Sequence, residues 1–494
     1  MRLLTRAALS DALVGTNYLP AEAERAAGND FEDIIRYRVF CMVWATGTLF
    51  HMAQSRIYIS ALHYVLLTIA ALALLVGTAS VLRLVIFVAL QLYEASMLQT
   101  ISNHWLFATF VNLTIAQVLI YLIIKRQSFW INKADFIKTL APIVRIELLL
   151  LYFFVVLHKL NSGFFSLENS CAALLLKEQH LDLLLPISEN LIKANIYLTI
   201  IIEALIPLLL IFRKTRNAGL LLGLAFHCVI AFNSFNGFYD FSSMVFGAYF
   251  LFTRYSFSNT IYIGYRKLVE YQARLKQQLV QFSFRNLVIL LALFLGGLVL
   301  LRVLTKVFND YFQLIWAFYS FLFIFVFLLS LALKIERRQE PPRAFKIANA
   351  AFLLFPLVVF LNGMSPYLGL KTESSFAMFS NLRTEGGVTN HFFIPISAQV
   401  FDYQKDMIEI VHSSEPQLQK VADENKLITF FQFQNHIAST RPTQVIYVRN
   451  GQRRTFTLAT ASPNDELLQK SSPILRRLLR FRAISKTEPQ PCQH

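Results

Sequence analysis

Residues 311–333 read YFQLIWAFYSFLFIFVFLLSLAL, a stretch of 23 residues without one charged side chain. An α-helix needs about 20 consecutive apolar residues to cross the hydrocarbon core of a bilayer. This stretch therefore predicts a transmembrane helix, and the fold class depends on how often the pattern recurs.

The pattern recurs along most of the 494-residue chain. Apolar residues make up 55% of the sequence, charged residues make up 15%, and the mean hydropathy is +0.50. Because an average soluble domain carries about 25% charged residues, this composition excludes a soluble multidomain protein. Ten further apolar stretches lie at 37–54, 57–78, 83–100, 104–124, 144–161, 191–212, 218–235, 240–253, 286–306 and 347–363. We expect an all-α polytopic membrane bundle of about 9–11 transmembrane helices.

The positive charge is distributed as in a membrane protein and not as in a nucleic-acid-binding protein. Of the net charge of +16, +12 lies in residues 1–363 and +4 in residues 364–494. The basic clusters of the first part fall between apolar stretches, and all lie on one side of the membrane if the N-terminus is cytoplasmic. We therefore predict a multi-pass protein of the cell membrane that contacts lipids and no nucleic acid.

This topology divides the chain into six segments. We expect a cytoplasmic segment at 1–35, a transmembrane domain at 36–255, a cytoplasmic basic linker at 256–285, further transmembrane helices at 286–363, a small extracytoplasmic α+β domain at 364–486 and a disordered tail at 487–494. The first thirty residues contain no apolar run long enough for a secretory signal peptide. The scattered cysteines (Cys41, Cys171, Cys228 and Cys492) indicate unpaired thiols and no disulfide framework.

The C-terminal segment contains two local signals. Val445–Val448 and Thr455–Leu458 flank Asn450-Gly451, a dipeptide typical of a type I′ β-hairpin turn. Ser462, followed by Pro463 and acidic residues, predicts a helix that runs to about Ile484. Leucines alternate with arginines along that helix, which therefore either packs on its own domain or lies on lipid headgroups.

Polar residues gather in the predicted outer halves of six spans. Ionisable groups inside a membrane are costly and mark functional sites by default, although interhelical hydrogen bonds and snorkelling lysines are the competing interpretation. The candidates are His51, His63, Glu94, Asn103, His104, His158, Lys159, His227, Asn233 and Asn236. Glu203, in the middle of the sixth span and followed by Pro207, is either a buried protonated carboxyl group or a cap for backbone groups that the proline frees.

The sequence carries no metal-binding motif, P-loop, dinucleotide fingerprint or nucleophile elbow, so we predict no metal. What remains is Lys159 with imidazole and amide neighbours. A lysine in a low-dielectric site can lose its charge near neutral pH and act as a general base. A lipid-soluble acid such as a quinol would fit that base.

Three short segments resemble the vitamin K-dependent gamma-glutamyl carboxylase family. Tyr152–Asn161 is similar to the segment around the family's catalytic lysine. Ser102–Leu106 resembles its Asn-Asn-His-Ser-Tyr-Leu stretch, and Phe226-His227-Cys228, followed by Asn233-Ser234, resembles its Phe-His-Cys-Met-Asn-Ser segment. These motifs lie within residues 30–255, which would be a horizontally transferred transmembrane (HTTM) domain. Leu361–Thr372 and Asn381–Gly387 look like bacterial HTTM proteins, some of which accompany thioredoxin-like thiol oxidoreductases.

The resemblance implies a lyase that uses a reduced quinone, molecular oxygen and carbon dioxide. The family's lysine deprotonates vitamin K hydroquinone, oxygen addition leads to an epoxide, and the strong base so formed removes a glutamate γ-proton before carbon dioxide adds. Carried over, Lys159 would be the base, and Asn103 and His104 would lie near the quinone and its developing oxyanion. His158, His227, Asn233, Glu94 and His63 are the predicted substrate-binding residues. A bacterial inner membrane and a thioredoxin-like partner are likewise implied by the resemblance alone.

The chain departs from the family at two acidic positions. The carboxylase sequence Lys-Leu-Asp-Ala-Asp-Trp is here Lys159-Leu160-Asn161-Ser162-Gly163-Phe164. The extramembrane C-terminal part is also shorter. We therefore expect a quinol-oxygenating enzyme, with carboxylation of a protein glutamate as an open question. The first alternative is a non-enzymatic scaffold or binding protein that recruits a partner through its C-terminal domain, and a transporter ranks last because no inverted repeat is visible.

Overall fold

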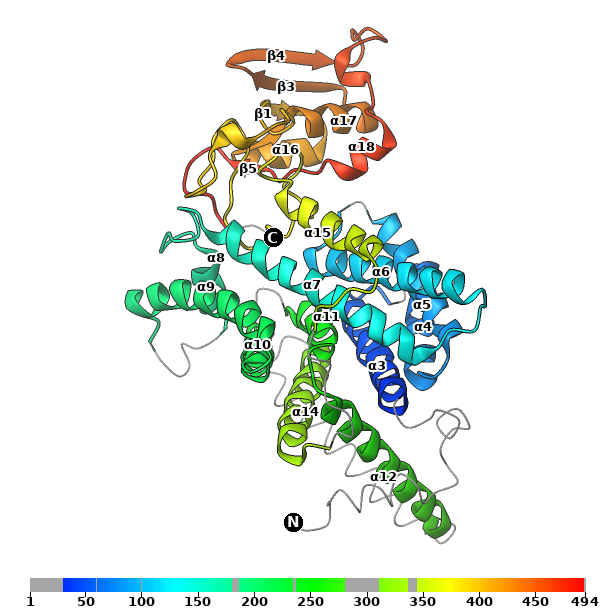
Figure 1. Cartoon of the computed structure of the whole chain (residues 1–494). Coiled ribbons are helices and arrows are strands. Elements are labelled where there is room, and N and C mark those ends of the chain that lie inside the picture. The colour runs from blue at the N-terminus through cyan, green and yellow to red at the C-terminus, as the bar shows by residue number, and fades with distance from the viewer. Residues whose placement is uncertain are drawn as a thin grey trace. The chain divides into compact units, whose positions relative to one another are not determined.

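The computed structural model describes residues 30–58, 60–98, 100–179, 186–233, 237–279, 311–335 and 344–492. These residues form two compact units that interleave along the chain (Figure 1). The first unit comprises the described residues up to Glu94, Val111–Ile146 and Leu208–Leu353. The second comprises Ala95–Phe110, Glu147–Pro207 and the described residues from Leu354 onward.

Helices account for the described part of the apolar region. They are α3 (Phe31–Gln54), α4 (Leu62–Val76), α5 (Val81–Met97), α6 (Asn103–Arg126), α7 (Lys133–Lys159), α8 (Cys171–Lys177), α9 (Glu189–Ile211), α10 (Arg216–Ile230), α11 (Tyr239–Phe250), α12 (Tyr255–Leu279), α14 (Tyr311–Leu333) and α15 (Leu354–Met364), with a 3₁₀ turn η2 (Ala350–Leu353) before α15. Each predicted span coincides with one of these helices except 286–306, which lies outside the described residues. The predicted basic linker is helical through Leu279.

Four helices in the described ranges, α6, α7, α9 and α14, are long and apolar enough to cross a membrane. Shorter apolar helices are α4, α10 and the segment Ala350–Met364. The fold class is thus the predicted one, a mostly helical multi-pass membrane protein with a small mixed C-terminal domain. The total of 9–11 spans and the sidedness stay predictions.

Two buried arginines hold the first unit together at the end of α11. Arg36 donates through Nη2 to the carbonyl oxygens of Leu251 at 2.7 Å and Thr253 at 2.8 Å. Arg145 donates to Leu251 O at 2.9 Å and to Ala344 O at 2.7 Å. Because the last carbonyls of a helix have no partner within the helix, these guanidinium groups satisfy them from neighbouring segments. Arg36 therefore has a packing role in the first unit.

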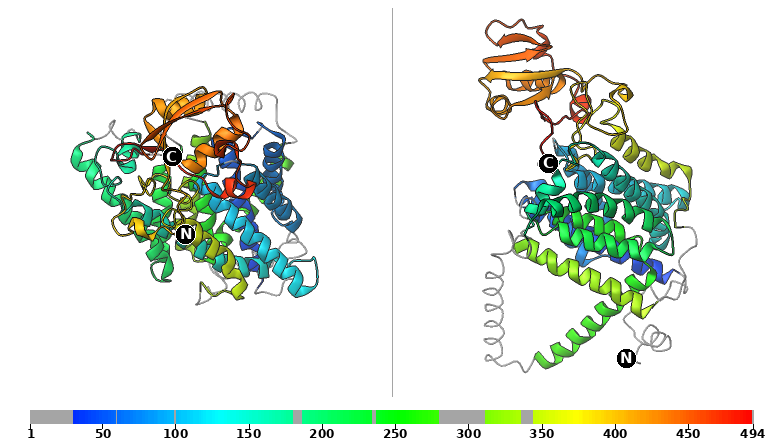
Figure 2. Two further views of the ribbon diagram at one scale, coloured as in Figure 1. Left: turned by 90° about the horizontal axis from the view of Figure 1, so that it is seen from above. Right: turned by 90° about the vertical axis from the view of Figure 1, so that its left-hand side faces the viewer.

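The C-terminal domain, orange to red in Figure 2, is built on a five-stranded antiparallel sheet. The strand order is β4-β3-β1-β2-β5. The strands are β1 (Met407–Ser413), β2 (Lys426–Thr429), β3 (Gln444–Arg449), β4 (Gln452–Thr457) and β5 (Ile484–Ser485). Helices α16 (Pro416–Asp423) and α17 (Phe430–Thr440) pack on the sheet, and a core that includes Ile408, Ile410, Phe433 and Val445 fills the space between them.

The predicted hairpin is confirmed. β3 and β4 pair from Gln444↔Thr457 to Arg449↔Gln452, and both turn residues, Asn450 and Gly451, have positive φ values of 52° and 73°. A type I′ turn requires positive φ at both positions, which asparagine and glycine tolerate best.

The predicted helix from Ser462 to Ile484 is wrong. The segment contains a 3₁₀ turn η4 (Glu466–Leu468) and a six-residue helix α18 (Pro473–Leu478), capped by Ser472. Beyond α18 the chain is extended, and Arg480 O accepts hydrogen bonds from Thr372 N at 2.9 Å and Glu373 N at 3.0 Å. Tertiary pairing with a distant segment thus overrides the local helix signal.

The predicted disordered tail is also wrong as far as Cys492, where the described residues end. Gln490 is buried, accepts at its main-chain oxygen from Asn381 Nδ2 at 3.1 Å and accepts at Oε1 from Ser485 N at 2.8 Å. Cys492 forms a disulfide with Cys171, 321 residues earlier, so the prediction of four unpaired thiols fails for this pair. Cys41 and Cys228 are free and buried.

The Glu415 carboxylate should make the stability of α16 depend on pH. Burial raises the pKa of this carboxyl group. Hydrogen bonds from Leu418 N at 2.8 Å and His436 Nε2 at 2.8 Å together lower it by more than burial raises it, so the pKa lies below its ordinary value of 4.5. A depressed pKa stabilises the fold above the ordinary value, and this contribution is lost as the pH falls through the folded-state pKa. Hydrogen exchange of α16 amides in the full chain should show Glu415→Gln destabilised by about 1–2 kcal/mol at pH 7, and the difference from wild type should be smaller at pH 3.

The matched control is Asp402→Asn, because the Asp402 side chain is mostly exposed. An effect of Glu415→Gln that is equal at both pH values would contradict the assigned role of the carboxylate.

Candidate functional site: a buried lysine–glutamate pair

Lys159 and Glu203 form a buried ion pair between α7 and α9 in the second unit. Lys159 is the last residue of α7, and Glu203 lies fifteen residues into α9. Their side chains are each 8% exposed, and Lys159 Nζ lies 2.5 Å from the carboxylate oxygens of Glu203. Both helices are apolar enough to cross a membrane. Two opposite charges therefore meet where water is scarce, which is the environment that most changes proton affinity.

An aromatic ring closes one side of the pair. Lys159 Nζ lies 5.6 Å from the centroid of the Phe164 ring, within the range of a cation–π contact. Phe164 in turn packs with Cys171, Ala172 and Ile196 in a small apolar cluster that Cys492 joins. The ion pair and the disulfide thus share Phe164 as a neighbour.

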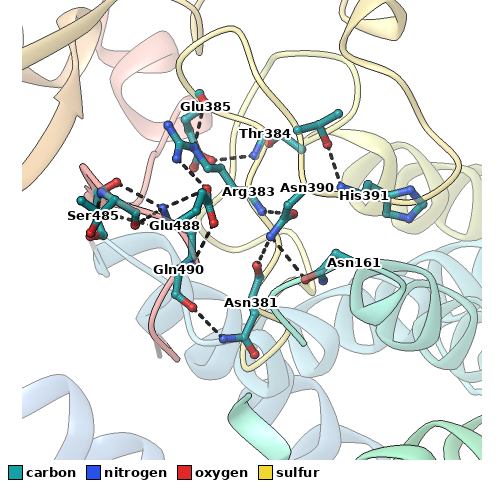
Figure 3. Close-up of polar contacts among 12 residues, drawn as sticks. Asn161, Asn381, Arg383, Thr384, Glu385, Asn390, His391, Ser485, Glu488 and Gln490 are labelled. Carbon is teal, nitrogen blue, oxygen red and sulfur yellow. Dashed lines mark hydrogen bonds and ion pairs between the residues drawn. The ribbon is translucent and has the colours of Figure 1, made fainter. Parts of the chain in front are cut away.

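Asn161 fixes the turn that places Lys159 at the end of α7. Its Nδ2 donates to His158 O and to Ser380 O, both at 2.7 Å. Its Oδ1 accepts from Phe164 N at 2.9 Å and from Asn390 Nδ2 at 3.3 Å. Figure 3 shows this fully buried amide beside Asn390 and Asn381, which link it to the C-terminal segment. All hydrogen-bonding positions of the Asn161 side chain are in use.

This geometry bears on Asn161 and Gly163, the two positions at which the sequence differs from the acidic residues of the carboxylase segment. A carboxylate at 161 would present oxygens to two carbonyl groups and has no hydrogen to donate to either. A Cβ at Gly163 would lie 3.1 Å from Asn381 Cβ and from Asn381 O, closer than ordinary van der Waals contact. The local packing of this chain therefore disfavours acidic residues at both positions.

Asn161→Asp should consequently destabilise the second unit although it is isosteric. Two donated hydrogen bonds are lost and a carboxylate is buried against carbonyl oxygens, at a cost of about 1–3 kcal/mol or more. Thermal unfolding of the detergent-solubilised protein would measure the effect, with Asn169→Asp as the control because the Asn169 side chain is more exposed. An unchanged unfolding midpoint for Asn161→Asp would show that the Asn161 amide does not donate to His158 O and Ser380 O.

His158 is held by protein groups at both ring nitrogens. Nε2 lies 3.1 Å from Ser375 O, a group that only accepts, so Nε2 carries the proton. Nδ1 then accepts from the hydroxyl of Tyr367 at 2.9 Å. The ring is fully buried. Because both of its nitrogens already have hydrogen-bond partners in the protein, a structural role is favoured over the predicted role in substrate binding.

Asn103 and His104 begin α6, as predicted, and belong to the same unit as Lys159. Asn103 Oδ1 accepts from Phe376 N at 3.1 Å, and His104 Nε2 lies 3.2 Å from Ser102 Oγ. Asn103 thus connects the start of α6 to the segment that follows α15.

The remaining predicted residues belong to the first unit. Glu94 is fully buried near the end of α5, and the half-buried His63 ring lies tilted against Tyr64 with ring centroids 4.1 Å apart. The His227 ring is buried beside Phe241 at 5.2 Å. Asn233 is buried after α10, and Asn236 lies outside the described residues. Of the predicted set, the second unit therefore contains Lys159, His158, Asn103 and His104.

Glu203 is the residue that sequence reasoning did not assign to the site. The sequence did contain a signal for this pairing, namely one carboxyl group and one amine in two apolar spans. Two opposite charges inside a membrane are tolerated best when they pair with each other.

No known protein family, curated protein or solved structure matches this chain.

Proposed function

We propose that the protein is a membrane enzyme that removes a proton from a reduced quinone or a similar lipid-soluble acid, with Lys159 as the base. The observation that carries this proposal is the buried Lys159–Glu203 pair. A proton that moves from the ammonium group to the carboxylate leaves a neutral amine, which is the form that a base requires.

In the proposed reaction the quinol O–H bond breaks and an N–H bond forms on Lys159. Addition of dioxygen to the quinolate then yields, over the whole turnover, the quinone epoxide and water from quinol and oxygen. Asn103 and His104 are the proposed donors to the developing oxyanion. Coupling to carbon dioxide fixation is the further step that resemblance to the carboxylase family suggests.

The disulfide supports a position for the proposed reaction on the extracytoplasmic side of the membrane. Disulfides persist in oxidising compartments, so the Cys171–Cys492 bridge favours an extracytoplasmic position for the C-terminal domain and the Lys159 end of α7. This agrees with a cytoplasmic N-terminus inferred from the basic clusters. We accordingly propose the cell membrane of a bacterium as the location and a thiol oxidoreductase of the thioredoxin-like class as a partner that acts on this bridge.

Epoxide formation tests the proposal directly. Purified protein in lipid nanodiscs would receive reduced vitamin K or menaquinol under oxygen, and epoxide would be measured by mass spectrometry. We expect epoxide from the wild type and none above background from Lys159→Ala. Lys177→Ala is the matched control, since Lys177 is an exposed lysine of α8 in the same unit.

The absence of epoxide from folded wild-type protein would contradict the proposal. In that case the second candidate function is a non-enzymatic scaffold, in which the Lys159–Glu203 pair holds two helices together and the C-terminal domain recruits a partner. This function is favoured because the polar atoms of the Asn161 and His158 side chains are already hydrogen-bonded within the protein.

A further inference from the structure

An uncharged, apolar segment of the second unit is exposed although it lies outside the long helices. Residues 386–401 contain no Asp, Glu, Lys or Arg, whereas the residues on either side, Glu385 and Asp402, are acidic. Within this segment Phe393 and Val400 are each 73% exposed, and Val388, Phe392 and Phe401 are also exposed. We call residues 386–401 the apolar loop. A patch of this kind on a soluble surface marks an interaction site.

The apolar loop is fixed to the end of α7 by backbone and side-chain hydrogen bonds. Phe392 N donates to Leu160 O at 3.0 Å, and Ser162 N donates to Asn390 O at 3.0 Å. His391 Nε2 donates to Leu157 O at 3.0 Å, while its Nδ1 accepts from the backbone N–H groups of Phe393 and Ile394.

The far end of the loop is fixed as well. Phe401 N donates to Leu368 O at 3.0 Å, and a Cβ at Gly369 would lie only 2.1 Å from Phe401 O. Gly369 has a φ of +81°, so glycine permits both the backbone conformation and the close approach. The exposed apolar side chains are therefore presented by an anchored backbone.

The loop is continuous with the exposed apolar surface of α9. The Phe165 ring lies 5.6 Å from Phe392 and 5.4 Å from Tyr197, a half-exposed residue in the third turn of α9. Further along α9 the exposed apolar side chains are Leu198, Ile201 and Leu205. Aromatic rings concentrate where a transmembrane helix meets the headgroup region.

We infer that the apolar loop inserts into the lipid leaflet on the Lys159 side of the membrane, so that the C-terminal domain is seated on the bilayer. Lipid is the occupant that the geometry favours, because the loop is attached to the end of one membrane-spanning helix and is continuous with the apolar face of another. The lack of charge over sixteen residues suits insertion below the headgroups. Quinol chemistry at Lys159 is not required for this inference.

Nitroxide labels in nanodiscs test it. Phe393→Cys and Val400→Cys would be labelled in full-length protein carrying Cys41→Ala and Cys228→Ala, and collision rates would be measured with oxygen, which partitions into lipid, and with a water-soluble nickel complex. Leu198→Cys on α9 is the lipid-exposed reference, and Thr455→Cys on the exposed part of β4 is the water-exposed reference. We expect both loop labels to prefer oxygen, as the α9 label does.

Two results would overturn the inference. A preference of both loop labels for nickel, as at Thr455, would place the loop in water. Protection from both reagents together with dipolar broadening between labels would show that a second copy of the chain covers the loop. Size-exclusion profiles and an intact Cys171–Cys492 bridge verify that each variant is folded.

Discussion

Replacing Lys159 alone by methionine is expected to lower the free energy of unfolding by about 3–5 kcal/mol, because it leaves Glu203 as an unpaired charge in a buried site. Glu203→Gln should have an effect of the same order, since the ammonium group of Lys159 then lacks its counter-charge 2.5 Å away. Titration of the solubilised protein with SDS, followed by helical circular dichroism, would give both values.

The double variant Lys159→Met/Glu203→Leu separates the structural from the catalytic role of the pair. Removing both charges also removes their desolvation, so the double variant should be markedly more stable than the sum of the two single effects predicts. If the pair serves catalysis, the stable double variant still forms no epoxide. Single variants as stable as the wild type would show that the pair does not exist in the folded protein.

Loss of the Cys171–Cys492 bridge is expected to lower the free energy of unfolding of the second unit by about 2–5 kcal/mol. The bridge joins positions 321 residues apart and ties the final residues to α8. Cys492→Ala should also free residues 487–492, because the contacts that hold them besides the bridge include only hydrogen bonds, mainly of Gln490, and an ion pair between Arg383 and Glu488 within the described residues. Figure 3 shows these groups side by side.

Peptide mapping without reductant would detect the bridge, and limited proteolysis would detect release of the C-terminal peptide. Cys228→Ala is the control, because that cysteine is buried and free and therefore closes no loop. Equal protease resistance of Cys492→Ala and wild type would show that the bridge does not hold the tail.

Local patterns in the sequence determined the elements whose signals are short-range. The uncharged stretch at 311–333 became α14 because a helix that satisfies its own backbone is the stable way to place apolar residues in lipid. The β3–β4 hairpin followed from Asn450-Gly451, since the turn type depends on two adjacent residues. The position of Asn103 and His104 at the start of α6 was likewise visible in the sequence.

Features that join distant parts of the chain depended on the tertiary structure. Lys159 and Glu203 are 44 residues apart, and no local rule states that the two helices turn these side chains toward each other. The Asn161 amide is satisfied by Ser380 and Asn390, more than 200 positions away, and the predicted helix at 462–484 yielded to backbone pairing with Thr372 and Glu373. The sequence by itself therefore determined a polytopic helical membrane protein with a small α+β domain. Only the tertiary structure decided which buried charges meet. A charge in an apolar span needs a partner, and the positions of charged residues along the chain do not identify which residue that partner is.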